Sequence, residues 1–338
     1  MQLLMKRRKF LQASGLAGAG LWLTPNAGFS TNFQPAEDVS VGIIGLDTSH
    51  SPAFTKILNA AGSGFKVTHA YPHGSRDIES STSRIPRFTE EVKGLGVSVV
   101  DSLDALLSQV DAVLLETNDG RRHLEQAEAV FKAGKKMFID KPMAASLEDV
   151  IRIFDLAEQY RIPTFSASSL RFSPSTMAVR GGKIGQVTGA DVYSPCTLEE
   201  THPDLFWYGI HGVESLFTVM GTGCQTVRRI HREGMDIVIG EWADGRVGTF
   251  RGIRDGKTGY GGTAFGTEGI APAGVYEGYE PLVREIMQFF KTNESPIPQE
   301  ETIEIFAFMA AADESKRKGG KAVSVEKVLA KARKRAGL

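Results

Sequence analysis

The chain has 338 residues, with 39 Lys and Arg against 40 Asp and Glu, and it contains two cysteines. This charge balance gives no overall field that favours nucleic acid, an anionic membrane or a strongly charged partner, so a small neutral or weakly charged ligand is expected. The length exceeds what one hydrophobic core usually organises and favours two domains. Cys196 and Cys224 have no metal-site or disulfide-framework spacing, and we expect two buried thiols, with a single disulfide between them as the alternative.

Residues 1–30 have the pattern of an export signal. Four basic residues at 6–9 precede a weakly apolar stretch at 16–23, and small residues follow up to Ser30. The string beginning Arg7-Arg8 resembles a twin-arginine signal. The apolar stretch is too short for a permanent anchor. We therefore expect a periplasmic or otherwise exported protein, the alternative being a frayed basic terminus on a cytosolic enzyme.

From residue 36 to 168 the pattern alternates between strands and helices. The expected strands are 39–45, 65–71, 112–116, 136–140 and 164–167. The expected helices are 51–61, 103–107, 123–133 and 147–160. This alternation predicts an α/β domain with a doubly wound parallel sheet, in which ligands bind beyond the carboxyl ends of the strands. The connection 72–96 is long, and we expect it to cover the ligand site.

Residues 169–338 have a different pattern, with longer strands in which polar and apolar residues alternate. The expected strands are 187–193, 227–232, 235–241 and 245–251. The expected helices are 205–220, 281–291 and 301–318. This half is predicted to be an α+β domain with an open, mostly antiparallel sheet that binds substrate.

The turn after the first strand occupies the place of a Rossmann dinucleotide fingerprint, G-x-G-x-x-G. The residues expected to bind the cofactor here are Gly45, Asp47, Thr48, Ser49 and His50. Asp47 and His50 stand where the second and third glycines would be. A carboxylate beside a pyrophosphate is repulsive unless it turns away or caps the helix, so simple helix capping is the alternative interpretation.

The loop after the second strand lacks the usual ribose-binding acid and contains Ser75 and Arg76. These two residues are suited to a 2′-phosphate, the alternative being a solvated loop arginine. The cofactor is therefore left open between NAD and NADP.

The strongest local signal is Asp140-Lys141-Pro142 after a buried strand. A lysine at a strand end can donate to a reacting hydroxyl or carbonyl, which makes Lys141 a predicted catalytic residue. At this point the chain resembles the Gfo/Idh/MocA family (glucose-fructose oxidoreductase, inositol dehydrogenase), in which a Glu-Lys-Pro tripeptide stands at this place. Asp140 is a mild departure. The family's Thr-Pro-Asn segment resembles the stretch with Thr117 and Asn118, so the resemblance adds these two residues and Asp140 to the predicted cofactor contacts.

The resemblance runs from residue 40 nearly to the C-terminus, through the strings at 170–174, 182–187 and 265–269. It implies a Rossmann domain followed by an open α+β sheet, a nicotinamide ring between them, and sugars, cyclitols or their derivatives as substrates. A homo-oligomer through the C-terminal sheet is a separate expectation, with the oligomeric state itself left open.

The family's second catalytic element, Asp-x-x-x-His, resembles the segment from Trp207 to His211. His211 is therefore predicted to carry a proton, although Trp207 replaces the aspartate and leaves Asp204 and Glu214 as the nearest carboxylates in sequence. A core histidine satisfied by Glu214 is the alternative. The residues expected to contact substrate are Arg171, His202, Asp204, Trp207, Tyr208 and His211.

The leading hypothesis is an NAD(P)-dependent oxidoreductase that acts on a carbohydrate, a polyol or a derivative. One alternative is a lyase or glycoside-cleaving enzyme that uses tightly bound NAD transiently. The other is a non-catalytic sugar-binding relative. We identify no metal ligands in the sequence and expect no nucleic-acid partner and no stable membrane insertion after signal cleavage.

Overall fold

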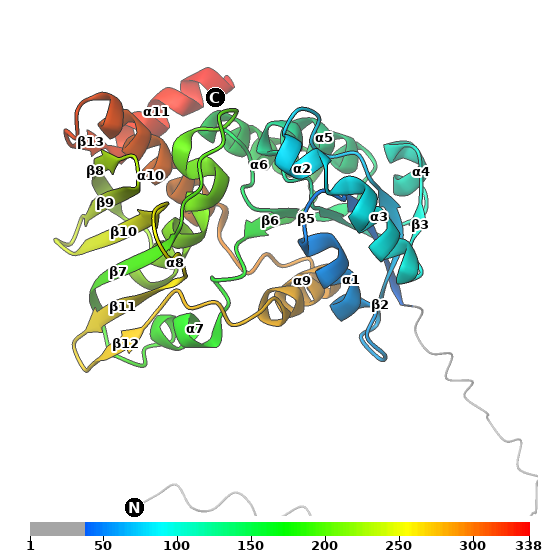
Figure 1. The fold of residues 1–338 in the computed structure, drawn as a ribbon, viewed down its shortest axis with the longest axis horizontal. Coiled ribbons are helices and arrows are strands. Elements are labelled where there is room, and N and C mark those ends of the chain that lie inside the picture. The colour runs from blue at the N-terminus through cyan, green and yellow to red at the C-terminus, as the bar shows by residue number, and fades with distance from the viewer. Residues whose placement is uncertain (1–37) are drawn as a thin grey trace, which may run out of the picture. The chain divides into compact units, whose positions relative to one another are not determined.

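The computed structural model describes residues 38–338, and Glu37–Leu338 form one compact unit. The predicted signal at 1–30 lies outside the described residues. Two sheets organise the unit (Figure 1). One is built from strands between residues 39 and 167 and the other from strands between residues 187 and 324, on either side of the predicted boundary at 168.

The first sheet has six parallel strands in the order β3-β2-β1-β4-β5-β6. Its strands are β1 (Val39–Ile44), β2 (Phe65–Tyr71), β3 (Ser98–Val99), β4 (Ala112–Leu115), β5 (Lys136–Asp140) and β6 (Thr164–Ala167). The order reverses between β1 and β4, which is where such sheets open a crevice for ligands. The predicted doubly wound Rossmann sheet is confirmed.

Alternate residues of each strand enter two different cores, because successive side chains point to opposite faces. Val41 and Ile43 of β1 pack on one side, whereas Ile44 packs on the other. The first side is covered by α1 (His50–Leu58), α3 (Ile85–Gly94) and α9 (Glu280–Thr292). The second is covered by α4 (Leu103–Leu107), α5 (His123–Lys132) and α6 (Leu147–Tyr160).

The connection 72–96 is more ordered than expected from its sequence. It holds a short helix, α2 (Glu79–Thr82), followed by α3. Phe88 and Val92 are four residues apart on one face of α3, and both are buried against the first sheet. The segment is therefore part of the fold as well as a cover for the carboxyl ends of β1, β2 and β4.

The second sheet has seven strands in the order β12-β11-β7-β10-β9-β8-β13. Its strands are β7 (Val187–Pro195), β8 (Cys224–Arg232), β9 (Met235–Trp242), β10 (Val247–Ile253), β11 (Gly261–Gly266), β12 (Ile270–Pro272) and β13 (Val323–Ser324). All its pairs are antiparallel except β7 with β10. The predicted open, mostly antiparallel sheet is confirmed.

One face of this sheet packs on helices and the other is exposed. The predicted helix 205–220 is a π-helical turn, η2 (Leu205–Gly209), that continues into α8 (Ile210–Met220), and α8 packs on β7 and β10. The other face carries exposed apolar side chains, including Tyr193, Ile230 and Phe265. The remaining helical elements are η1 (Gly120–Arg122), α7 (Pro174–Arg180), α10 (Gln299–Arg317) and α11 (Val325–Ala336).

Helices from the end of the chain return to the first sheet. α9 packs on α1 and β5, while α10 and α11 pack on α6 (Figure 1). One core therefore runs through both halves, and the predicted division into domains at 36–168 and 169–338 stays a prediction. None of the helices between residues 38 and 338 is both long and apolar enough to cross a membrane.

Candidate active site

A cavity of about 430 Å³ lies at the carboxyl ends of β1, β4, β5 and β6, facing the start of α8. From the first half it is lined by Thr48, Ser49, His50, Asn118 and Lys141, all of them predicted cofactor contacts. From the second half it is lined by Trp207, Tyr208, His211, Tyr260, Tyr276 and Tyr279. The structure thus brings together the two predicted catalytic residues, Lys141 and His211, although they belong to different halves of the chain.

The turn after β1 needs glycine only at its first fingerprint position. Gly45 has φ +91°, and a Cβ there would lie 2.6 Å from the backbone of Thr117. Asp47, at the second position, is fully buried. Its carboxylate accepts hydrogen bonds from the backbone N–H (2.7 Å) and hydroxyl (2.5 Å) of Ser75 and from the backbone N–H of Asn118 (3.0 Å). Asp47 therefore binds the loops after β2 and β4 rather than capping α1.

Further polar contacts join the 72–96 segment to the loop after β4. The Asn118 side chain donates to the Ser81 hydroxyl at 2.7 Å. Arg121 forms ion pairs with Asp77 and Asp119. We call the contacts Asp47–Ser75, Asn118–Ser81 and Arg121–Asp77 the clasp. The clasp crosses the ends of β1, β2 and β4, where a Rossmann fold places the adenosine half of a dinucleotide.

The cavity and the clasp differ in how well they fit the two ends of a dinucleotide. Lys141, Asn118 and the turn at 48–50 face a cavity of a size suited to a nicotinamide riboside and a small substrate. At the other end, Asp47 occupies the position of the glycine that the pyrophosphate approaches, and Ser75 is buried against it. Arg76, predicted to accept a 2′-phosphate, is exposed. The cavity therefore fits the nicotinamide end of a dinucleotide, whereas the adenosine end can bind only if the clasp opens.

Lys141 follows β5, and its side chain is almost fully buried. Its Nζ lies 3.5 Å from Asp140 Oδ2. The same Oδ2 lies 2.8 Å from His50 Nδ1, and the His50 ring stacks on Phe54. Burial alone would raise the pKa of Asp140, but the charges of His50 and Lys141 hold it below its usual range. Asp140 is therefore an ionised carboxylate that positions both His50 and Lys141.

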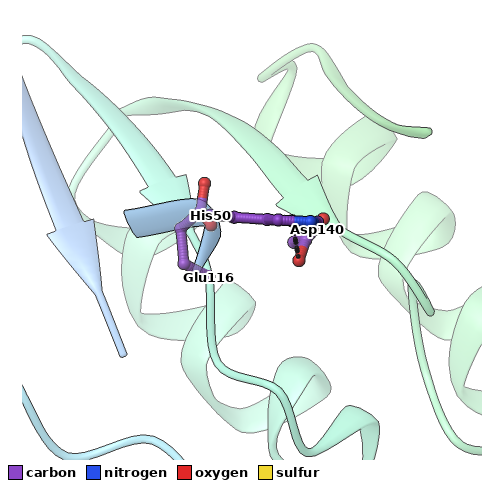
Figure 2. A group of neighbouring side chains, drawn as sticks. All are labelled: His50, Glu116 and Asp140. Carbon is purple, nitrogen blue, oxygen red and sulfur yellow. Dashed lines mark hydrogen bonds and ion pairs between the residues drawn. The ribbon is translucent and has the colours of Figure 1, made fainter. Parts of the chain in front are cut away.

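Glu116 was missed by the sequence analysis, although it follows β4 directly. It is fully buried, and its side chain points toward His50 and Asp140 (Figure 2). Neither of its carboxylate oxygens has a hydrogen-bond partner in the described part of the chain. Burial and the neighbouring Asp140 raise the pKa of Glu116 well above its usual value. The sequence signal that could have identified Glu116 is its position, since it is a glutamate at the end of a buried strand.

His211 is the second residue of α8, and its orientation comes from Ser168. Its Nδ1 lies 2.7 Å from Ser168 Oγ, and the Ser168 backbone N–H donates to Glu214 at 2.7 Å. Burial and the Lys141 charge lower the pKa of His211 well below its usual value. Burial raises the pKa of Glu214 to about 7. Glu214 therefore binds the backbone of Ser168, while His211 binds its hydroxyl.

Three predicted substrate contacts lie outside the cavity. Arg171 forms a buried ion pair with Glu301, and its Nε lies 3.6 Å from Glu214. Asp204 pairs with Arg229 and Lys316 instead of orienting His211. His202 is buried against Asp119 and packs on Trp207. These residues stabilise the walls of the site.

Aromatic side chains form one wall of the cavity. Trp207 and Tyr208 line the cavity as predicted. The Tyr208 hydroxyl lies 3.1 Å from that of Tyr260, and burial raises the pKa of Tyr260 above its usual range. Tyr260, Tyr276 and Tyr279 were not predicted, because they come from loops with no recognisable motif. The wall presents flat rings and neutral hydroxyls, which suit the faces and hydroxyl groups of a sugar or cyclitol.

Both cysteines are buried free thiols, as expected, and burial raises the pKa of each to about 12. Neither lines the cavity. The cysteines therefore belong to the core and not to the cavity.

Residues 39–165 match the model of the GFO_IDH_MocA family, which is described as an oxidoreductase family with an NAD-binding Rossmann fold. An uncharacterised oxidoreductase of Escherichia coli (strain K12), YhhX, is 24% identical over 140 residues, which are 37% of this chain and 40% of that protein. The match therefore spans well under two thirds of that relative. The prediction of a nicotinamide-dinucleotide Rossmann domain is confirmed by the family model.

Solved structures confirm the fold over both halves. A probable dehydrogenase from Thermotoga maritima has a TM-score of 0.71 at 19% identity, covering 86% of this chain and 100% of the other. A scyllo-inositol dehydrogenase from Lactobacillus casei, solved with NAD(H) and scyllo-inositol, has a TM-score of 0.70 at 18% identity, covering 86% of this chain and 100% of the other.

Proposed function

We propose that the protein is an NAD-dependent oxidoreductase that interconverts a secondary alcohol and a ketone on a carbohydrate, a cyclitol or a derivative. The observation that carries the proposal is the meeting of Lys141 and His211 in one cavity that aromatic side chains also line. The family match over residues 39–165 and the likeness to an inositol dehydrogenase support it.

The bound nicotinamide would accept the hydride from the alcohol carbon, and the residues of the chain would manage the hydroxyl proton. His211 is neutral near pH 7 because its pKa is depressed, so it can accept a proton. The role of His211 as a proton acceptor requires the tautomer in which its Nδ1–H donates to Ser168 Oγ, at 2.7 Å, and its Nε2 is free. Lys141, held by Asp140, can donate to the substrate oxygen.

The test is a titration of the purified protein with NAD and NADP, followed by a screen of inositols and sugars for reduction of the dinucleotide. We expect binding of NAD and reduction with at least one cyclic polyol. Turnover of a glycoside or an elimination substrate without net reduction would instead support the transient-oxidation alternative.

The clasp favours a second candidate, a sugar-binding relative without a nucleotide. The contacts of Asp47 with Ser75 and Asn118 close the adenosine end with groups of the chain itself. This candidate requires that a polyol binds with no dinucleotide present and that neither NAD nor NADP has measurable affinity. The titration above therefore separates the two functions.

We also propose export through the signal at 1–30 and assembly of a homo-oligomer through the exposed face of the second sheet. Tyr193 and Phe265 on that face are two of its exposed apolar side chains. Light scattering of the wild type against Tyr193→Asp would test the assembly. An unchanged mass would contradict the proposed interface.

A further inference from the structure

Glu116 and Asp140 place three unpartnered oxygens in the interior. Both oxygens of Glu116 and Oδ1 of Asp140 are buried and have no hydrogen-bond partner among residues 38–338. Burying a carboxylate without partners is costly, and native structures satisfy nearly all such groups with protein, water or an ion. These oxygens therefore indicate a missing ligand.

The three strand ends at this place supply a compact donor set. His50 begins α1 directly after the β1 turn, Glu116 follows β4, and Asp140 ends β5. One ligand atom from each residue lies within 4.8 Å of the others, and their side chains point toward one another (Figure 2). Donors about 2.0 to 2.2 Å from a shared tetrahedral ion lie roughly 3.3 to 3.6 Å apart, so side-chain movements of about an ångström would bring all three onto one ion.

The local charge also favours a cation. The groups that act on Glu116 are the carboxylates of Asp140 and Asp47 and the ammonium of Lys141. With Glu116 itself, and with His50 neutral as a metal ligand must be, three carboxylates face one ammonium. Lys141 contacts only Oδ2 of Asp140, at 3.5 Å, and leaves the unpartnered oxygens free. A divalent ion would balance the two excess negative charges.

We propose that His50, Glu116 and Asp140 bind one divalent transition-metal ion at the carboxyl ends of β1, β4 and β5. One imidazole with two carboxylates suits Zn²⁺ or Mn²⁺, whereas Mg²⁺ prefers oxygen ligands alone. The ion displaces the proton shared by His50 Nδ1 and Asp140 Oδ2, which are now 2.8 Å apart. The ion also fixes the three loops that carry these ligands. Two of the loops place a side chain in the cavity, namely His50 itself and Lys141, the neighbour of Asp140. This proposal is independent of the oxidoreductase reaction.

The experiment uses the full chain, stripped with a chelator and dialysed. Titration calorimetry with Zn²⁺, Mn²⁺ and Mg²⁺, combined with elemental analysis, measures affinity and stoichiometry. We expect one equivalent of Zn²⁺ or Mn²⁺, tighter than Mg²⁺, with proton release seen as a dependence of the heat on the buffer. Glu116→Gln and His50→Gln should each weaken binding by about a hundredfold or more, because even the loss of a residue that supports a ligand costs about 10–100-fold.

Glu304→Gln is the matched control, since Glu304 is a partly buried carboxylate on α10 that binds the backbone of Cys224. It should bind the metal as the wild type does. Circular dichroism and thermal unfolding establish whether each variant is folded. If one of them does not fold, Asp140→Asn is titrated in its place. No binding above the adventitious level, a preference for Mg²⁺, or equal binding by folded Glu116→Gln would overturn the proposal. A metal titration needs no substrate or dinucleotide, so its result does not depend on the proposed function.

Discussion

Asp47 and Ser75 are joined by two hydrogen bonds, one to the serine N–H and one to its hydroxyl, across a separation of 28 residues. This contact links the turn after β1 to the loop after β2. In a glycine-rich fingerprint the corresponding space is left for the nucleotide. Here the aspartate fills it, and burial raises the pKa of Asp47 even though its hydrogen bonds with Ser75 and Asn118 oppose the shift.

Asp47→Gly should strengthen NAD binding while weakening the fold. The variant removes a carboxylate beside the expected pyrophosphate. Such a charge contributes about 1 to 4 kcal/mol of repulsion at about 4 Å, which corresponds to roughly fivefold or more in affinity. It also leaves the N–H groups of Ser75 and Asn118 without a partner, which costs about 1 to 3 kcal/mol each when they stay buried. Calorimetric titration with NAD and urea unfolding measure the two effects.

Ser75→Ala is the control for this prediction. It removes the hydroxyl contact but keeps the Asp47 charge and the backbone N–H bond. We expect little gain in NAD affinity from it. Equal affinities for the wild type and Asp47→Gly would mean that the carboxylate does not limit nucleotide binding.

Arg171→Met should destabilise the fold rather than weaken substrate binding specifically. Arg171 is buried and pairs with Glu301, and removing one partner of a buried ion pair costs about 3 to 5 kcal/mol. Chemical denaturation of this variant, compared with Arg284→Met on the exposed pair with Glu280, measures the difference. A stable variant that had lost only ligand affinity would restore the predicted role of Arg171 as a substrate contact.

The fold was predictable because strand and helix periods are local properties of the chain. Local pattern indicated the part of the site that follows strands, such as Lys141, since the ends of parallel strands meet at one edge, whereas His211 was predicted only from the family resemblance. Ser168 and Tyr260 contact cavity residues far away in sequence, and no local pattern marks such contacts. The direction of the Asp47 side chain depends on Ser75, and the spacing of the fingerprint carries no information about that partner.

Stability should fall as pH rises through the range in which Glu214 ionises. The pKa of Glu214 is raised to about 7 from 4.5, so between these values the folded state holds a proton that the unfolded state has lost. The contribution is fully present below about pH 4.5 and is lost above about pH 7. It amounts to at most about 3 kcal/mol, by the usual conversion of 1.36 kcal/mol per pKa unit.

Glu214→Gln isolates this contribution, because the amide cannot ionise and its oxygen can still accept the Ser168 N–H bond. The difference in the free energy of unfolding between wild type and variant, measured by denaturation from pH 4 to 8, should change in that window. A difference independent of pH would show that the ionisation of Glu214 is not linked to folding.

Export should depend on the two arginines of the predicted signal. Replacing Arg7 and Arg8 by lysine preserves the charge but removes the pair that defines a twin-arginine signal. We expect the variant to stay in the cytoplasm, as measured by fractionation of cells that express it beside the wild type. Unchanged export would remove the twin-arginine argument and leave the fold and the site unaffected.

Lys141→Ala and His211→Ala should each lower turnover by roughly a hundredfold or more, the usual size of a lost general acid or base. Both side chains reach the same cavity, from β5 and from α8. Removal of Lys141 also leaves Asp140 without its ammonium partner, which acts on binding and stability as well as on turnover. Lys132→Ala, on an exposed pair with Glu128, is the control that should retain wild-type turnover.

Ser168 separates positioning from proton transfer in the same site. Its hydroxyl orients His211 at 2.7 Å but does not line the cavity, so Ser168→Ala should lower kcat by roughly tenfold with little change in KM. Ser168→Thr keeps the hydroxyl and should restore most of the rate. The pH dependence of kcat in Ser168→Ala should also shift, because the imidazole loses a hydrogen-bond partner. If neither the rate nor the pH profile changes, His211 does not depend on Ser168, and the proposed tautomer with a free Nε2 is wrong.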